Sequence, residues 1–118
     1  MSFNERRKSP RVEVDLPVSL EGAEGEISGR ALNISTTGIY FELPHYIEPM
    51  TKIRMGLSVP ASGEGTGREV VQFDGVVVRT EPESPEDGVV DYRMAVFFTS
   101  VPEKSLEALT GFISSKTE

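Results

Sequence analysis

Hydrophobic and polar residues alternate along much of the chain, with the two-residue period of strands that bury one face. Between Val12 and Leu20 every second residue is aliphatic, and the residues between them are mostly polar. Pro17 lies among the outward positions of this run, which predicts an edge or a bulge there. Five further strands are predicted over residues 27–34, 39–43, 53–59, 70–80 and 91–99. Gly75, inside one of them, predicts another bulge or a close approach of the backbone.

Turn-forming segments separate these strands. They read EGAEGE, STTG, HYIEPMTK, ASGEGTGRE and EPESPEDG, and they are rich in glycine, proline and acidic residues. No long amphipathic helix lies between the strands, so a doubly wound α/β fold is not expected. Short alternating strands joined by turns predict an all-β fold, an antiparallel sandwich or a small barrel.

The hydrophobic period changes at the C-terminus, where a short helix is predicted to pack on the sheet. Ser100 and Glu103 have the spacing of a capping box, and Pro102 is predicted to lie in the first turn. The apolar stripe of this helix consists of Leu106, Leu109, Phe112 and Ile113.

Composition predicts one soluble domain. The chain has 118 residues, of which 37% are hydrophobic and 26% charged, with no cysteine. No run approaches the ~20 apolar residues of a membrane helix, and no apolar stretch follows the N-terminal charges as in a secretory signal. We therefore expect a cytoplasmic protein without membrane insertion. The net charge of -7 argues against a nucleic-acid partner.

The cations are unevenly distributed. The segment ERRKSPR, residues 5–11, holds four positive charges in seven positions. A small cationic site on an acidic body suits a compact anion better than a long polyanion. This charge pattern divides the chain into an N-terminal segment, residues 1–11, and a β domain, residues 12–118.

No enzyme, metal site or cofactor is predicted. His45 is the only histidine, lies beside Pro44 in a predicted loop, and has no GxSxG turn to accompany it. The acidic residues of the turns lack the spacing of a calcium loop. The glycines of residues 63–67 are not followed by the Lys-Ser/Thr of a phosphate-binding loop.

Two motifs remain. The first is Arg7-Lys-Ser-Pro-Arg11, which on its own reads as a solvated tail. The second is Asn33-Ile-Ser35-Thr-Thr-Gly38, which on its own reads as a turn after a strand. In that turn Asn33 or Ser35 would bond to nearby backbone and Gly38 would supply a positive φ.

Taken together, RxxxR before the first strand and [Asp/Asn]xSxxG about twenty residues later resemble the PilZ family of cyclic di-GMP receptors. DLPV after the first motif, the GVVVR strand and a final strand running into a helix extend the similarity over nearly the whole chain. The resemblance implies a six-stranded antiparallel β-barrel, split-barrel-like, with a C-terminal α-helix. It also implies cyclic di-GMP as the ligand.

The family pattern assigns Arg7 and Arg11 to the phosphates and a guanine, from a segment that closes over the ligand. Arginine suits both, because its fork matches guanine O6 and N7 and also pairs with phosphate. Asn33 and Ser35 would bond to a second guanine, and Gly38 would keep the backbone within reach. Many members have aspartate where this chain has Asn33, a change expected to lower affinity.

Two further arginines are candidates for the same site. Arg6 precedes the motif, and an arginine there resembles receptors that bind an intercalated ligand dimer. Arg79, on the GVVVR strand, is a weaker candidate, because the interpretation that it is simply an arginine exposed on a strand is nearly as good.

The resulting hypothesis is a receptor or adaptor that changes conformation on binding cyclic di-GMP and regulates a protein partner. One alternative is a protein-interaction module of the same fold with weak or no nucleotide binding. A less favoured alternative is a small barrel that binds single-stranded RNA. It is less favoured because few aromatic residues are expected to be exposed on the strands and because the chain outside the N-terminal segment is strongly negative.

Overall fold

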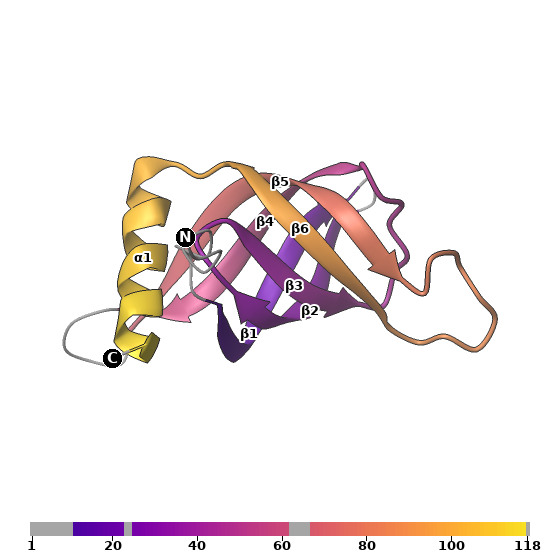
Figure 1. Cartoon of the computed structure of the whole chain (residues 1–118), viewed down its shortest axis with the longest axis horizontal. Helices are drawn as coiled ribbons and strands as arrows, with labels where there is room; N and C mark the ends of the chain where they lie inside the picture. The colour runs from indigo at the N-terminus through magenta and orange to yellow at the C-terminus, as the bar shows by residue number, and fades with distance from the viewer. Residues whose placement is uncertain (1–10, 23–24, 62–66, 118) are drawn as a thin grey trace, which may run out of the picture.

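The fold is described from a computed structural model, over residues 11–22, 25–61 and 67–117. Six antiparallel strands close into a barrel in the order β1-β2-β3-β6-β5-β4 (Figure 1). The elements are β1 (Val12–Gly22), β2 (Gly25–Ile34), β3 (Gly38–Leu43), β4 (Lys52–Pro60), β5 (Arg68–Glu81), β6 (Tyr92–Ser100) and α1 (Glu103–Thr117). The six predicted strands and the C-terminal helix are thus confirmed, and of the two predicted architectures the chain adopts the barrel.

Alternation along each strand fills the barrel interior, because successive side chains point to opposite faces. The burial of β6, for example, alternates strictly from Tyr92 to Phe98. The largest fully buried side chains are Phe41, Phe73, Leu20, Ile34, Ile39, Leu43, Leu57, Met94 and Leu109. They come from every strand and from the helix, so a single core holds the whole domain together.

The helix α1 lies at one end of the barrel, opposite the end from which the β5–β6 connection extends (Figure 1). It contacts β5, β1 and β4, and buries Leu109, Phe112 and Ile113. Ser105 fixes its position, since its Oγ accepts a 2.9 Å hydrogen bond from the Gln72 amide on β5. No helix in these described ranges is long and apolar enough to cross a bilayer.

The predicted capping box is wrong. Ser100 is the last residue of β6 and pairs with Asp74 of β5, so its backbone is extended. The first helical hydrogen bond runs from the Leu106 amide to the Pro102 carbonyl at 2.8 Å. Pro102 is therefore the residue before the helix rather than part of its first turn, and Glu103 begins the helix.

Both predicted backbone irregularities are present. The register of β1 shifts between Glu13 and Leu16, just before Pro17, and that of β5 shifts between Asp74 and Gly75. A Cβ at Gly75 would lie 2.6 Å from Val96 Cγ1, so glycine is required there by close packing.

Candidate functional site

A row of four residues crosses the outer surface of four adjacent strands. Asn33 on β2 pairs with Tyr40 on β3, Tyr40 pairs with Ala95 on β6, and Ala95 pairs with Arg79 on β5. Residues 33 and 79 are far apart in sequence, and the closed sheet brings them to one face. A hollow of about 310 Å³ lies along this row, lined by Arg11, Asn33, Ile39, Tyr40, Arg79 and Ala95.

Arg11 joins the two motifs at one edge of this hollow. Its Nη1 donates a 2.6 Å hydrogen bond to Asn33 Oδ1. The reason is the antiparallel pairing of β1 with β2, in which Val12 lies opposite Ile34. The residue before β1 must then lie beside the turn that follows β2. The second guanidinium nitrogen of Arg11 points toward that turn, 3.6 Å from where a Cβ on Gly38 would be.

Ser35 organises the turn between β2 and β3. Its side chain is buried, and its Oγ accepts hydrogen bonds from the amides of Thr37, at 3.1 Å, and Gly38, at 3.2 Å. The Ser35 amide in turn donates to the Gly38 carbonyl at 2.9 Å. A hydroxyl offers two acceptor positions, and here backbone amides take both. The oxygen therefore holds the loop beside the hollow in shape.

Gly38 is required by close packing rather than by its φ angle. A Cβ at this position would lie 2.6 Å from the carbonyl oxygen of Val96 on β6. The expected positive φ is wrong, because among the described glycines it occurs at Gly25 and Gly88. The turn instead brings Gly38 directly into the β3–β6 ladder, opposite Phe97.

Arg79 reaches the hollow through a β-bulge. The register of β5 against β6 shifts between Val77 and Arg79, so Val78 and Arg79 are both exposed on the outer face. The Arg79 side chain is 63% exposed, and its Nε lies 3.5 Å from Glu81 Oε2. The structure thus brings Arg79 to the same hollow as Arg11 and Asn33.

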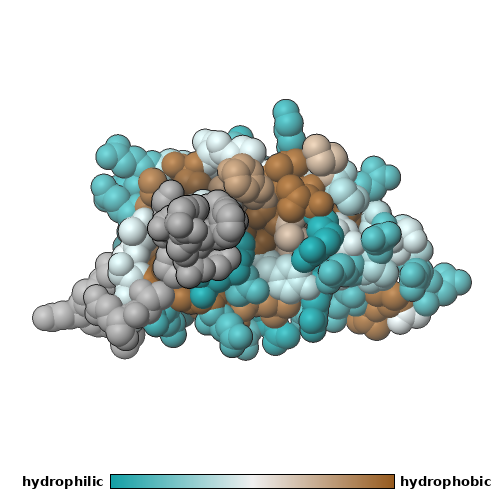
Figure 2. Space-filling model, viewed as in Figure 1, coloured by the Kyte–Doolittle hydropathy of each residue, from teal (hydrophilic) through white to brown (hydrophobic). Residues whose placement is uncertain are grey.

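Apolar surface gathers over β5 and β6 on this side of the molecule and is bordered by hydrophilic side chains (Figure 2). Val78 and Phe97 are large apolar residues of these strands that remain about half exposed. Because Val78 directly precedes Arg79, charge borders an apolar surface here, a combination suited to a ligand with both a ring and an anionic group.

Tyr40 and Glu81 are the residues of this site that sequence reasoning missed. The Tyr40 hydroxyl donates a 2.8 Å hydrogen bond to Glu81 Oε1. Partial removal from water raises the pKa of the Tyr40 phenol, and the bond to Glu81 raises this pKa further. An available signal was the outward position of an aromatic residue on the strand that directly follows the NISTTG motif.

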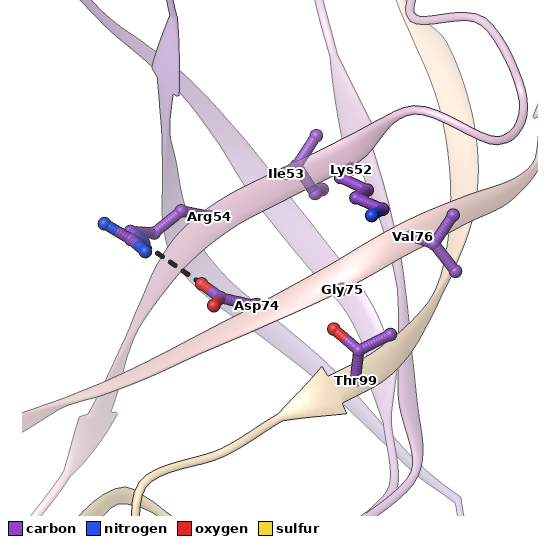
Figure 3. Close-up of a pocket in the computed structure, with 7 residues that line it drawn as sticks. All are labelled: Lys52, Ile53, Arg54, Asp74, Gly75, Val76 and Thr99. Atoms are coloured by element: carbon purple, nitrogen blue, oxygen red, sulfur yellow. Dashed lines mark hydrogen bonds and ion pairs between the residues drawn. The ribbon is translucent and has the colours of Figure 1, made fainter.

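A larger hollow, of about 640 Å³, opens on β4, β5 and β6 (Figure 3). Its charged lining includes Arg54 and Asp74, which form an ion pair at 3.0 Å. None of the predicted ligand-binding residues lines it. The smaller hollow, which holds Arg11, Asn33 and Arg79, is therefore the stronger candidate site.

The predicted contacts from Arg6 and Arg7 fall outside the described residues. The described chain begins at Arg11, at the edge of the smaller hollow. Arg11, Asn33 and Arg79 are therefore the predicted residues that the structure brings to one cavity, with Ser35 and Gly38 in the loop beside it.

The sequence profile of the PilZ domain matches residues 5–115, which is nearly the whole chain and includes both motifs. The chain belongs to the PilZ family. No curated protein matches it in a direct sequence comparison.

Solved structures of PilZ proteins share the fold. The Bacillus subtilis inhibitor of motility, MotI/DgrA, superposes with a TM-score of 0.74 at 20% identity. The match covers 95% of this chain and 52% of that one, so this PilZ chain spans about half the length of MotI. The PilZ domain of YcgR from Escherichia coli, solved with c-di-GMP, superposes with a TM-score of 0.67 at 17% identity. That match covers 95% of this chain and 92% of the YcgR domain. At these identities the likeness concerns the fold alone.

Proposed function

We propose that this PilZ domain is a receptor for cyclic di-GMP and binds it at the hollow between Arg11 and Arg79. The observation that carries the proposal is the Arg11–Asn33 hydrogen bond, which joins the two family motifs at the edge of that hollow. PilZ domains act as ligand-binding and adaptor modules rather than enzymes, and the YcgR domain of the same fold was solved with this ligand.

The residues suit the chemistry of the ligand. Cyclic di-GMP has two guanine bases and two phosphodiesters. Arg11 and Arg79, on opposite sides of the hollow, present planar guanidinium groups that pair with phosphate or with guanine O6 and N7. Asn33 supplies an amide for a guanine edge, and the buried Ser35 keeps Gly38 in position.

Arg6 and Arg7 complete the proposed site from the N-terminal segment, residues 1–11, which we propose folds over the ligand. Ordering a residue costs roughly 1–2 kcal/mol of backbone entropy. Charge-assisted hydrogen bonds, worth about 1.5–3 kcal/mol each, exceed that cost only when several form together. This coupling makes the segment a switch, through which a cytoplasmic adaptor of this kind controls a protein partner.

Isothermal titration of the whole chain with cyclic di-GMP tests this function. We expect Arg7→Ala and Arg11→Ala each to weaken binding by roughly 10- to 100-fold, as loss of a charge-assisted contact implies. Arg54→Ala is the matched control, because it removes an exposed arginine from the larger hollow. Two ligands per chain that fall to one in Arg6→Ala would support the role of Arg6.

Three outcomes would contradict the proposal. A wild-type chain that does not bind cyclic di-GMP would instead be a PilZ-fold interaction module. Tighter binding to single-stranded RNA than to cyclic di-GMP would favour the RNA-binding alternative. Wild-type affinity in both Arg7→Ala and Arg11→Ala would place the ligand elsewhere on the barrel.

A further inference from the structure

Tyr40 is the aromatic residue among those that line the hollow, and it belongs to neither motif. It lies between Asn33 and Ala95 in the row across the barrel, and its ring is partly exposed. A partly exposed tyrosine beside two arginines and an amide gives the hollow an aromatic surface as well as charge.

The hydrogen bond to Glu81 determines how this ring lies. Tyr40 is on β3 and Glu81 is on β5, with β6 between them. Two strand spacings amount to about 9.5 Å. The phenol oxygen can approach Glu81 Oε1 to 2.8 Å only if the side chain extends along the barrel surface across β6. The ring therefore lies over the sheet instead of standing away from it.

Ala95 provides the space for this arrangement. It is the β6 residue directly opposite Tyr40, and its side chain is a single methyl group. This small side chain leaves room for the ring above β6, and both Tyr40 and Ala95 line the hollow. An aromatic ring is what a purine base stacks on.

Glu81 contacts both Tyr40 and Arg79, the two residues at this end of the hollow. Its Oε1 accepts the hydrogen bond from Tyr40, and its Oε2 lies 3.5 Å from Arg79 Nε. One carboxylate thus keeps an aromatic ring and a guanidinium group side by side. That pairing offers a base one stacking surface and one hydrogen-bonding fork.

We propose that Tyr40 is the stacking surface for a guanine base of cyclic di-GMP and that Glu81 is the residue that positions it. This inference rests on the proposed function and adds a base-recognition residue that lies outside both motifs. Stacking of this kind accounts for roughly 5- to 150-fold in affinity.

Titration of three variants with cyclic di-GMP tests the assignment. Tyr40→Leu removes the aromatic face and should weaken binding by that factor, whereas Tyr40→Phe keeps the face and should stay within about fivefold of wild type. Glu81→Gln removes the charge that holds Tyr40 and Arg79, and an intermediate loss is expected. Tyr46→Phe is the control, because Tyr46 packs edge-on against Tyr92, with ring centroids 5.6 Å apart, and does not line the hollow.

Tyrosine fluorescence adds a readout that a structural role would not change. The chain has three tyrosines and no tryptophan, so its emission comes from tyrosine. Saturating cyclic di-GMP should quench emission in the wild type and in Tyr46→Phe, and the component assigned to Tyr40 should be missing in Tyr40→Phe. The Tyr40→Phe titration also corrects for absorption of light by the nucleotide.

The results separate the two proposals. Wild-type affinity in Tyr40→Leu, or the same quenching in Tyr40→Phe as in wild type, overturns the role of Tyr40 while the receptor function stands. Failure of the wild-type chain to bind overturns both. Circular dichroism of each variant identifies a loss of binding that follows from unfolding, and the fluorescence of the folded Tyr40→Phe variant then decides the question.

Discussion

The guanidinium group of Arg11 donates a 2.6 Å hydrogen bond to the side-chain oxygen of Asn33, 22 residues further along the chain. The contact forms because β1 and β2 are antiparallel, so the start of one strand lies beside the end of the other. It brings the last arginine of RxxxR to the first residue of NxSxxG. Two motifs that are separate in sequence thus form one edge of a single hollow.

Changing Asn33 to aspartate should strengthen both this contact and ligand binding. A carboxylate accepts a charge-assisted hydrogen bond from Arg11 and offers two acceptor oxygens to the guanine N1–H and N2–H₂ groups. Such bonds exceed neutral ones by about 1 kcal/mol, which corresponds to roughly fivefold in affinity. Titration of Asn33→Asp with cyclic di-GMP measures this, with Asn33→Ala as the weakened reference. Unchanged or weaker binding in Asn33→Asp would argue against a guanine contact at this position.

Removing the Ser35 hydroxyl should destabilise the domain. The amides of Thr37 and of the buried Gly38 lose their acceptor in Ser35→Ala, at a cost of about 1–3 kcal/mol. Thermal or urea unfolding followed by circular dichroism measures the change. Ser28→Ala, at an exposed serine on β2, should leave stability within about 0.5 kcal/mol of wild type. Equal stability of both variants would show that water replaces the hydroxyl in the turn.

A side chain at Gly38 should push β3 away from β6. The added Cβ of Gly38→Ala would lie 2.6 Å from the Val96 carbonyl oxygen, and relief requires a backbone shift that costs about 1–3 kcal/mol. Gly56→Ala is the matched strand control, because its nearest neighbours would lie 3.4 Å and 3.5 Å away. Urea unfolding should therefore separate the two variants. Similar midpoints would mean that the β3–β6 ladder adjusts without cost.

The Tyr40 phenol should titrate above the ordinary tyrosine value of 10. Burial is the largest cause of its raised pKa, and the hydrogen bond to Glu81 is the next. Absorbance at the phenolate band, compared between wild type and Tyr40→Phe, isolates this group. Glu81→Gln should lower the pKa of Tyr40, because the charge of Glu81 is lost while Arg93, which lowers this pKa, remains nearby. A Tyr40 pKa that is the same in Glu81→Gln and in wild type would contradict the contact.

The same shift makes a prediction for stability. The folded state holds the Tyr40 proton more tightly than the unfolded state does, so the contribution is complete below pH 10 and decreases as the pH rises through the folded pKa. Urea unfolding should accordingly show a smaller loss of stability between neutral and strongly alkaline pH in Tyr40→Phe than in wild type.

Gly111→Ala should stabilise the C-terminal helix. Gly111 lies inside α1, and a Cβ there would meet nothing within 4 Å. Alanine restricts the unfolded chain and favours the helix by about 1 kcal/mol, which should raise the melting temperature by several degrees. Gly88→Ala is the contrasting control, since space is also open there but φ is +86°, where alanine is strained. A melting temperature of Gly111→Ala below that of wild type would mean that α1 needs the glycine for packing.

Local patterns predicted the strands well, because alternation is imposed directly by which face of a strand meets the core. They were less informative where one residue could belong either to the end of a strand or to the start of a helix. Ser100 has the spacing of a helix cap, but pairing with Asp74 makes it the end of β6, and the helix begins after Pro102. The requirement for Gly38 was also misread, because the nearby Val96 carbonyl belongs to a strand more than fifty residues away.

By itself, the sequence determined the strands, the terminal helix, the all-β class and the motif residues Arg7, Arg11, Asn33, Ser35 and Gly38, since each depends on residues near one another in the chain. Only the tertiary structure decided which side chains share the hollow. Barrel closure and the bulge before Arg79 bring that residue into line with Asn33, and the same register lays Tyr40 across β6 toward Glu81. These relationships depend on strand register, which is set by core packing among distant segments and not by local sequence.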